Sequence, residues 1–155
     1  MSDIVLDRLS LDDLEKIRAD ALEAGLPFSG QVPPRLAWEL FSRDEAVLVD
    51  VRSAEERKFV GHVPGSLHVA WASGTSLTRN PRFVRELEAK VGKATIVLLL
   101  CRSGKRSALA AEAATKAGLP NVFNVLEGFE GELDADQHRG GADGWRFRGL
   151  PWVQD

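Results

Sequence analysis

One short segment of this sequence places a nucleophile directly before a basic loop. Residues 95–100 are apolar and begin with β-branched side chains, a pattern typical of a central strand in a parallel sheet. Cys101 is the first residue past the end of that strand. In open α/β sheets, ligand sites lie at the carboxyl ends of the strands, so Cys101 is predicted to lie in the functional site. The loop after it consists of Arg102, Ser103, Gly104, Lys105 and Arg106, and Ser107 opens an alanine-rich helical stretch.

The residues after Cys101 favour the thiolate form of its side chain. Backbone N–H groups of a tight loop can surround an anion, and the N-terminus of the following helix adds positive potential. Gly104 gives the loop the backbone freedom that a tight turn needs. Three loop cations add further positive charge. Because the thiolate is the nucleophilic form of cysteine, the pattern predicts a reactive cysteine beside an anion-binding loop.

Two plainer interpretations fit the same residues. A free cysteine is often a small buried core residue, and basic residues often form an ordinary solvated turn. The first interpretation is disfavoured because five polar or glycine residues follow Cys101 at once. The second is disfavoured because the basic residues lie directly beside this cysteine.

The sequence around this segment alternates between helical and strand patterns. A first helix is predicted over about residues 10–25, because Ser10 and Asp13 resemble a capping box. Strands separated by helices predict a parallel α/β sheet with right-handed crossovers. Further helices are expected over 34–41, 55–59, 80–91 and 107–117, and strands over 31–32, 46–49, 67–70, 95–100 and 122–126.

The last stretch, about 134–155, is glycine-rich but contains Trp145, Phe147 and Trp152. These aromatic residues are too apolar for a free tail. We expect an irregular segment that packs back on the domain, with a partner surface as the alternative.

Length and composition indicate one globular domain without a metal or cofactor. The chain has 155 residues, of which 44% are hydrophobic, and a net charge of −3, so it can bury a core and is not expected to be disordered. A single cysteine excludes an internal disulfide framework and a multi-cysteine zinc site, and the three histidines are not at ligand spacing.

Charge and hydropathy also limit the kinds of partner and the cellular location that the sequence allows. The acidic balance argues against nucleic-acid binding, and the longest apolar run, 96–101, is far shorter than the roughly 20 residues of a membrane span. The N-terminal stretch is acidic and lacks the pattern of a secretory signal, so a cytoplasmic location is expected.

Three blocks of the chain carry a resemblance to a known family. They are VLVDVRSAEERKFVGHVPGS at 47–66, CRSGKRS at 101–107 and NVFNVLEGFEG at 121–131. In this order and spacing they resemble a single-domain rhodanese of the thiosulfate sulfurtransferase family. The resemblance covers most of residues 33–133. It implies one rhodanese-like domain in residues 1–155, with a five-stranded parallel sheet flanked by helices on both faces.

The resemblance also implies a role for each matching residue. Cys101 matches the catalytic cysteine of the family, whose thiolate takes the outer sulfur of thiosulfate and releases sulfite. The persulfide then passes its sulfur to cyanide, a thiol or a protein acceptor. The loop that would hold the anionic donor and the persulfide comprises Arg102, Ser103, Gly104, Lys105, Arg106 and Ser107.

Three residues outside the loop are candidates for shaping the site. Asp50 and Arg52 match a block at a strand end, where a salt bridge that fixes the loop is favoured over contact with substrate. Trp71 follows the strand at 67–70, where it could line the pocket or fill the core.

Two rival functions belong to the same fold. A phosphatase or arsenate reductase needs an arginine six positions after the cysteine, whereas here that position is Ser107 and Arg106 comes one residue early. A non-catalytic regulatory module often lacks the cysteine, which this chain has. The sequence therefore favours a sulfurtransferase whose donor is thiosulfate or a persulfide.

Overall fold

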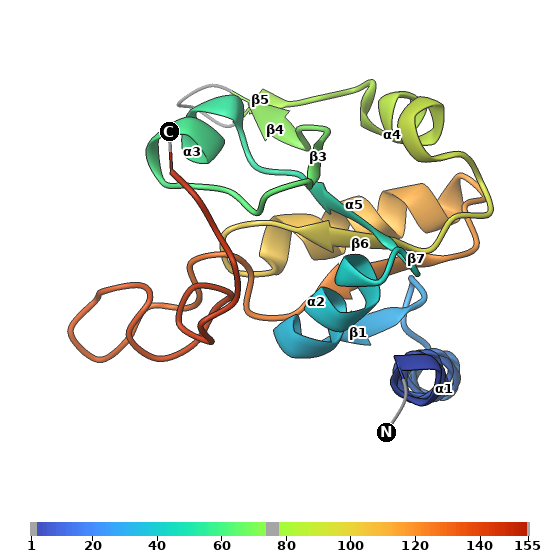
Figure 1. Ribbon diagram of the computed structural model, residues 1–155. Coiled ribbons are helices and arrows are strands. Elements are labelled where there is room, and N and C mark those ends of the chain that lie inside the picture. The colour runs from blue at the N-terminus through green and yellow to red at the C-terminus, as the bar shows by residue number, and fades with distance from the viewer. Residues whose placement is uncertain (1–2, 74–77, 155) are drawn as a thin grey trace.

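Five parallel strands form the central sheet of the protein (Figure 1). The computed structural model describes residues 3–73 and 78–154. The sheet order is β1-β7-β6-β2-β3, which confirms the predicted five-stranded parallel sheet. β6 is the middle strand and is buried at every position, which explains its unbroken apolar sequence. The strands are β1 (Gly30–Val32), β2 (Val47–Asp50), β3 (Leu67–His68), β6 (Val97–Leu100) and β7 (Val122–Val125).

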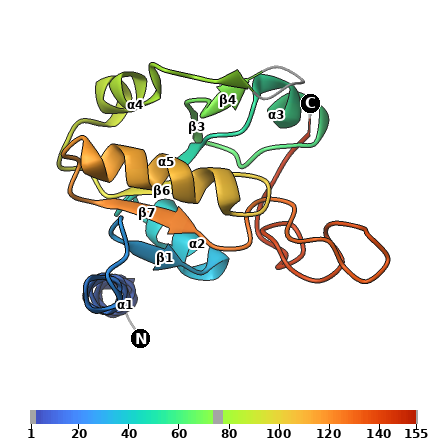
Figure 2. The same ribbon diagram turned by 180° about the vertical axis from the view of Figure 1, so that it is seen from behind.

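Helices cover both faces of this sheet (Figures 1 and 2). On one face, α1 (Asp3–Ala24) and α2 (Pro34–Ser42) pack against side chains such as Leu98 and Leu100. On the other face, α4 (Phe83–Val91) and α5 (Lys105–Lys116) pack against side chains such as Leu99. The alternation along β6 therefore divides the core into two layers. None of the helices in the described part of the chain combines the length and the apolarity that a membrane crossing requires.

Several elements differ from the predictions. β3 ends at His68 rather than at residue 70, and α4 begins at Phe83 rather than at residue 80. α1 begins at Asp3 rather than near Ser10, because the Ser10 hydroxyl does not cap a helix but donates to Oε2 of Glu39 on α2 at 3.2 Å. A short antiparallel pair, β4 (Ala72–Ser73) and β5 (Thr78–Arg79), was not predicted, since two-residue strands carry no recognisable period.

The C-terminal segment folds back onto the domain. Trp145 is fully buried, its Nε1 donates to the carbonyl oxygen of Pro151 at 2.8 Å, and its ring meets that of Trp38 edge to face. Trp152 packs on Phe129 with ring centroids 6.0 Å apart. In both views this segment lies on the same side of the molecule as α3 (Ala54–Phe59) and the loop from β6 to α5.

A buried ion pair fixes the chain where it leaves β2. The guanidinium of Arg52 donates from Nε to Oδ1 of Asp50 at 3.0 Å and from Nη2 to Oδ2 at 2.7 Å, and both side chains are fully buried. Nη2 also donates to the carbonyl oxygen of Gly61, and the guanidinium lies over the ring of Phe129 at 4.3 Å. Arg57 of α3 adds a third contact, from Nη1 to Oδ2 of Asp50 at 3.1 Å. The pair thus joins β2, α3 and the segment after β7.

Removing one partner of this pair is expected to be costly. The variant Asp50→Ala leaves the Arg52 guanidinium buried without a counter-charge, and the free energy of unfolding should fall by about 3–5 kcal/mol. Urea unfolding of the variant and the wild type measures this change. Lys93→Ala is the matched control, because the exposed Lys93–Glu88 pair at 3.9 Å should contribute no more than about 1 kcal/mol. Equal effects of the two substitutions would contradict a structural role for the buried pair.

Candidate active site

Cys101 lies where β6 ends and the loop to α5 begins, as predicted. Its side chain is only 1% exposed and belongs to the core layer that also contains Leu99 and Ala110. In exposure, therefore, the residue resembles the buried core cysteine of the plainer interpretation. Its polar contacts do not, because a cysteine that served only as a core residue would need no donors around its sulfur.

Two donors point at the sulfur of Cys101. The backbone N–H of Gly104 donates to Sγ at 3.1 Å, and Oγ of Ser107 lies 3.2 Å from Sγ. Gly104 has a φ of +100°, in the left-handed region, and precedes the first residue of α5. This conformation turns its N–H toward the sulfur at the helix N-terminus. The N–H of Gly104 and the helix dipole stabilise negative charge on the sulfur.

The segment after β7 holds the start of the loop in place. The backbone N–H groups of Phe129, Glu130 and Gly131 donate to the carbonyl oxygens of Cys101 and Arg102 at 2.7–3.1 Å. Gly128 makes this approach possible, since a Cβ on it would lie 2.4 Å from the backbone of Arg102. The third sequence block, whose glycines carried no assigned role at the sequence level, thus supports the loop.

The loop cations divide into two kinds. Arg106 is engaged by Glu56 of α3 through two parallel hydrogen bonds, Nη1 to Oε1 at 2.7 Å and Nη2 to Oε2 at 2.8 Å. Arg102 and Lys105 are exposed and have no ion-pair partner among residues 3–73 and 78–154. Ser103 is half-buried between them. Two of the three predicted cations are therefore available to an incoming anion.

The Glu56–Arg106 pair joins α3 to the loop. Burial raises the pKa of Glu56, but hydrogen bonds and charge from Arg106, with hydrogen bonds from Ser53, outweigh it and lower that pKa to about 2. The hydrogen bond with Glu56 raises the pKa of Arg106, and the nearby Cys101 contributes in the same direction. Both side chains are charged at neutral pH. Glu56 also closes the capping box of α3 with Ser53, so its role is structural rather than acid–base.

A buried polar network lies behind Ser107 and was not predicted. The Ser107 hydroxyl is close to Oδ1 of Asn124 on β7 as well as to Cys101. Nδ2 of Asn124 donates to Oε1 of Gln31 on β1 at 2.7 Å and to the carbonyl oxygen of Gly104 at 3.2 Å. The signal in the sequence was a lone polar residue, Asn124, within the apolar strand 122–125.

The other predicted residues lie around this centre. Asp50 and Arg52 bind each other at the end of β2, in the arrangement of the favoured salt bridge. Trp71 is 8% exposed and packs edge to face on Phe83 in the core layer of Cys101, while Arg79 covers its ring at 4.6 Å. In the described part of the chain, no three His, Cys, Asp or Glu side chains gather as ligands for a metal ion.

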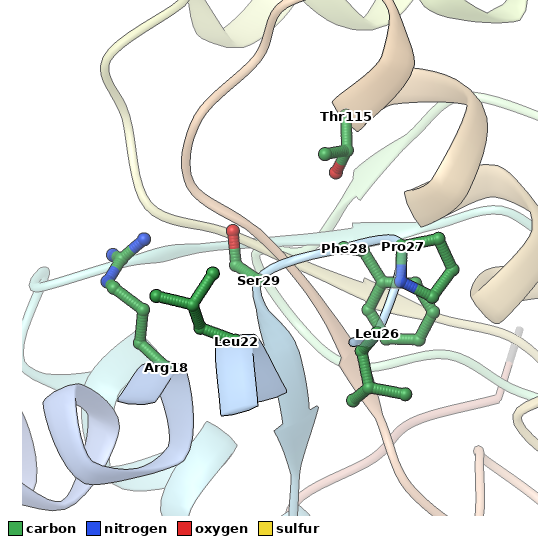
Figure 3. Close-up of a pocket in the computed structure, with 7 residues that line it drawn as sticks. All are labelled: Arg18, Leu22, Leu26, Pro27, Phe28, Ser29 and Thr115. Carbon is green, nitrogen blue, oxygen red and sulfur yellow. The ribbon is translucent and has the colours of Figure 1, made fainter. Parts of the chain in front are cut away.

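A separate pocket of about 470 Å³ lies at the far end of α5 from Cys101 (Figure 3). Among the described residues that line it, Arg18 alone is charged, and its guanidinium donates to Asn121 at 2.7 Å and to the carbonyl oxygen of Pro120. The other lining residues are apolar except for the hydroxyl side chains of Ser29 and Thr115. Its lining residues are Arg18, Leu22, Leu26, Pro27, Phe28, Ser29 and Thr115.

Comparison with known proteins agrees with this geometry. The model of the rhodanese-like domain matches residues 34–134. The crystal structure of Rv0390 from M. tuberculosis has 46% sequence identity and a TM-score of 0.74, covering 83% of this chain and 99% of that one. An uncharacterized protein of Rickettsia rickettsii is 36% identical over 73% of this chain and 87% of its own length. The thiosulfate sulfurtransferase GlpE of Pseudomonas putida is 31% identical over 64% of this chain and 81% of its own length.

The matched range contains the loop of Cys101, both partners of the Asp50–Arg52 pair and the segment that supports the loop. On these grounds the chain belongs to the rhodanese-like domain family.

Proposed function

We propose that the protein is a sulfurtransferase that carries a sulfane sulfur on Cys101, from thiosulfate or a persulfide donor to a thiol, protein or cyanide acceptor. The observation that carries this proposal is the environment of the Cys101 sulfur. This sulfur lies at the N-terminus of α5, accepts a hydrogen bond from Gly104 and is followed by two exposed cations, Arg102 and Lys105, that have no ion-pair partner in the described part of the chain. The relative from Pseudomonas putida that is named a thiosulfate sulfurtransferase supports it.

The proposed reaction has two halves. The Cys101 thiolate attacks the outer sulfur of thiosulfate, a new S–S bond forms, and the old S–S bond breaks as sulfite leaves with its electron pair. The acceptor thiolate or cyanide then attacks the outer sulfur of the persulfide and regenerates the Cys101 thiolate. Each half exchanges one bond to sulfur for another, so no oxidant, reductant or metal is required.

The surroundings of the sulfur suit this reaction better than phosphate chemistry. Arg106 is held by Glu56, so the arginine nearest to the phosphatase position is already neutralised. A persulfide adds one sulfur atom to Cys101 and fits a nearly closed site more easily than a tetrahedral phosphoryl group. Because Cys101 is 1% exposed, the donor can reach it only if the groups around the sulfur move.

The variant Cys101→Ser tests the nucleophile. Its rate of thiosulfate:cyanide sulfur transfer should fall to that of the reaction without protein, since the hydroxyl cannot carry a sulfane sulfur. Its far-ultraviolet circular dichroism spectrum should match the wild type, which shows that the fold is intact. Hydrolysis of a chromogenic phosphomonoester should be negligible for both proteins. Retained sulfur transfer by the variant, or rapid phosphomonoester turnover by the wild type, would contradict the proposal.

Single substitutions of the loop cations test which of them meets the anionic donor. Arg102→Ala and Lys105→Ala should each lower kcat/KM for thiosulfate by about tenfold, which is about 1.4 kcal/mol of lost binding to a charged group. Arg106→Ala should mainly lower the free energy of unfolding, because it leaves the partly buried Glu56 without its partner.

The matched control is Lys116→Ala, at the other end of the same helix, where the lysine is 72% exposed and pairs with Glu112. It should leave kcat/KM unchanged. If Arg102→Ala and Lys105→Ala behave like this control, the donor is held by backbone N–H groups alone.

A further inference from the structure

Ser107 lies between two groups that compete for its single hydroxyl proton. Its Oγ is 3.2 Å from Sγ of Cys101 and within hydrogen-bond distance of Oδ1 of Asn124. The three side chains are 0–2% exposed, so bulk water cannot supply a missing donor. A hydroxyl has one proton, so Ser107 can donate to only one of the two at a time.

The neighbours of Asn124 fix the orientation of its amide. Nδ2 donates to Oε1 of Gln31 at 2.7 Å and to the carbonyl oxygen of Gly104 at 3.2 Å. A carbonyl oxygen cannot donate, so turning the amide over would place two oxygens against each other at Gly104. The oxygen of Asn124 therefore faces Ser107 and acts as an acceptor.

This arrangement favours the neutral thiol over the thiolate. In the thiol form, the S–H of Cys101 donates to Oγ of Ser107, which donates to Oδ1 of Asn124, so each of these groups has a partner. When the thiol loses its proton to solvent, two acceptors compete for the one proton of Ser107. Either the thiolate or Asn124 then lacks that donor, and a buried unpaired acceptor is costly.

We infer that Asn124 is a positioning residue that retains the Ser107 proton and thereby opposes ionisation of Cys101. The inference rests on the proposed function for its consequence: in sulfur transfer, Asn124 limits the help that Ser107 gives to the nucleophilic thiolate. The thiolate accepts the N–H of Gly104 whether Ser107 donates to the sulfur or to Asn124. Asn124 therefore adjusts the ionisation of Cys101 rather than preventing it.

Other charged groups act on the same sulfur but not through this network. The hydrogen bonds of Asn124 go to Ser107, Gln31 and Gly104, all of them uncharged. A substitution at Asn124 therefore leaves the charged side chains in place. Those on the elements packed around the sulfur are Arg102, Lys105 and Arg106, Glu56 of α3, Asp50 and Arg52 at the end of β2, and Glu127 with its partner Arg148 after β7.

Ultraviolet titration of the thiolate tests the inference. The chain has one cysteine and no tyrosine, so the pH-dependent thiolate absorbance comes from Cys101 alone once the Cys101→Ser protein is subtracted. In Asn124→Leu the Ser107 proton is free to serve the thiolate, and the midpoint of the titration should move down by about 0.5–1 pH unit. If Asn124 only supported the loop, its substitution would loosen Gly104. The thiolate would then lose the N–H of Gly104, and the midpoint would move up.

Ser107→Ala provides the control for this route. Adding Asn124→Leu to Ser107→Ala should produce no downward shift, because no hydroxyl is left to donate. If Asn124→Leu does not fold, Asn124→Ala takes its place, because it removes the same acceptor. An unchanged or higher midpoint in the folded Asn124 variant, or the same downward shift without Ser107, would overturn the inference. The titration requires no turnover. If the wild type transfers no sulfur, the proposed function is refuted, but a downward shift of the midpoint in the Asn124 variant still supports the inference.

Discussion

The constraint on which the site depends is that negative charge must be held on a sulfur atom almost out of contact with water. Cys101 is 1% exposed, so its stabilisation comes from fixed groups of the protein rather than from solvent. The N–H of Gly104 and the N-terminus of α5 supply it directly. Arg106 adds positive charge, but Glu56 offsets much of it. The sulfur is thus supported mainly by backbone dipoles, which are already oriented before any substrate binds.

The rest of the domain serves to keep those dipoles in place. The Asp50–Arg52 pair fixes the chain after β2, and Arg52 stacks on Phe129, which belongs to the segment that binds the start of the loop. Gly128 lets that segment touch the backbone of Arg102. The loop is also bound to α3 through Arg106 and to β7 through the Gly104 carbonyl, while Arg102 and Lys105 are exposed. A firmly bound loop backbone and exposed cations suit a site that receives a small anion.

The parts of the site that lie close together along the chain could be predicted from sequence, and the distant ones could not. Cys101, its loop and the start of α5 are adjacent in sequence, so strand, loop and helix patterns sufficed to place the nucleophile. The order of the strands in the sheet was not predicted, because local strand patterns do not say which strands are neighbours. The pairing of Arg106 with Glu56 and of Ser107 with Asn124 joins residues 50 and 17 positions apart, and nothing in local periodicity selects such partners. Ser10 misled the prediction of the first helix for the same reason, since its partner Glu39 lies 29 positions away.

Mass spectrometry of the protein treated with thiosulfate and kept free of reductant tests the central claim most directly. The account predicts that the intact wild-type chain gains the mass of one sulfur atom, that proteolysis maps it to the peptide containing Cys101, and that cyanide removes it. The Cys101→Ser protein should gain nothing. A wild-type chain that gains no sulfur, or an equal gain in the variant, would show that Cys101 is not a sulfur carrier.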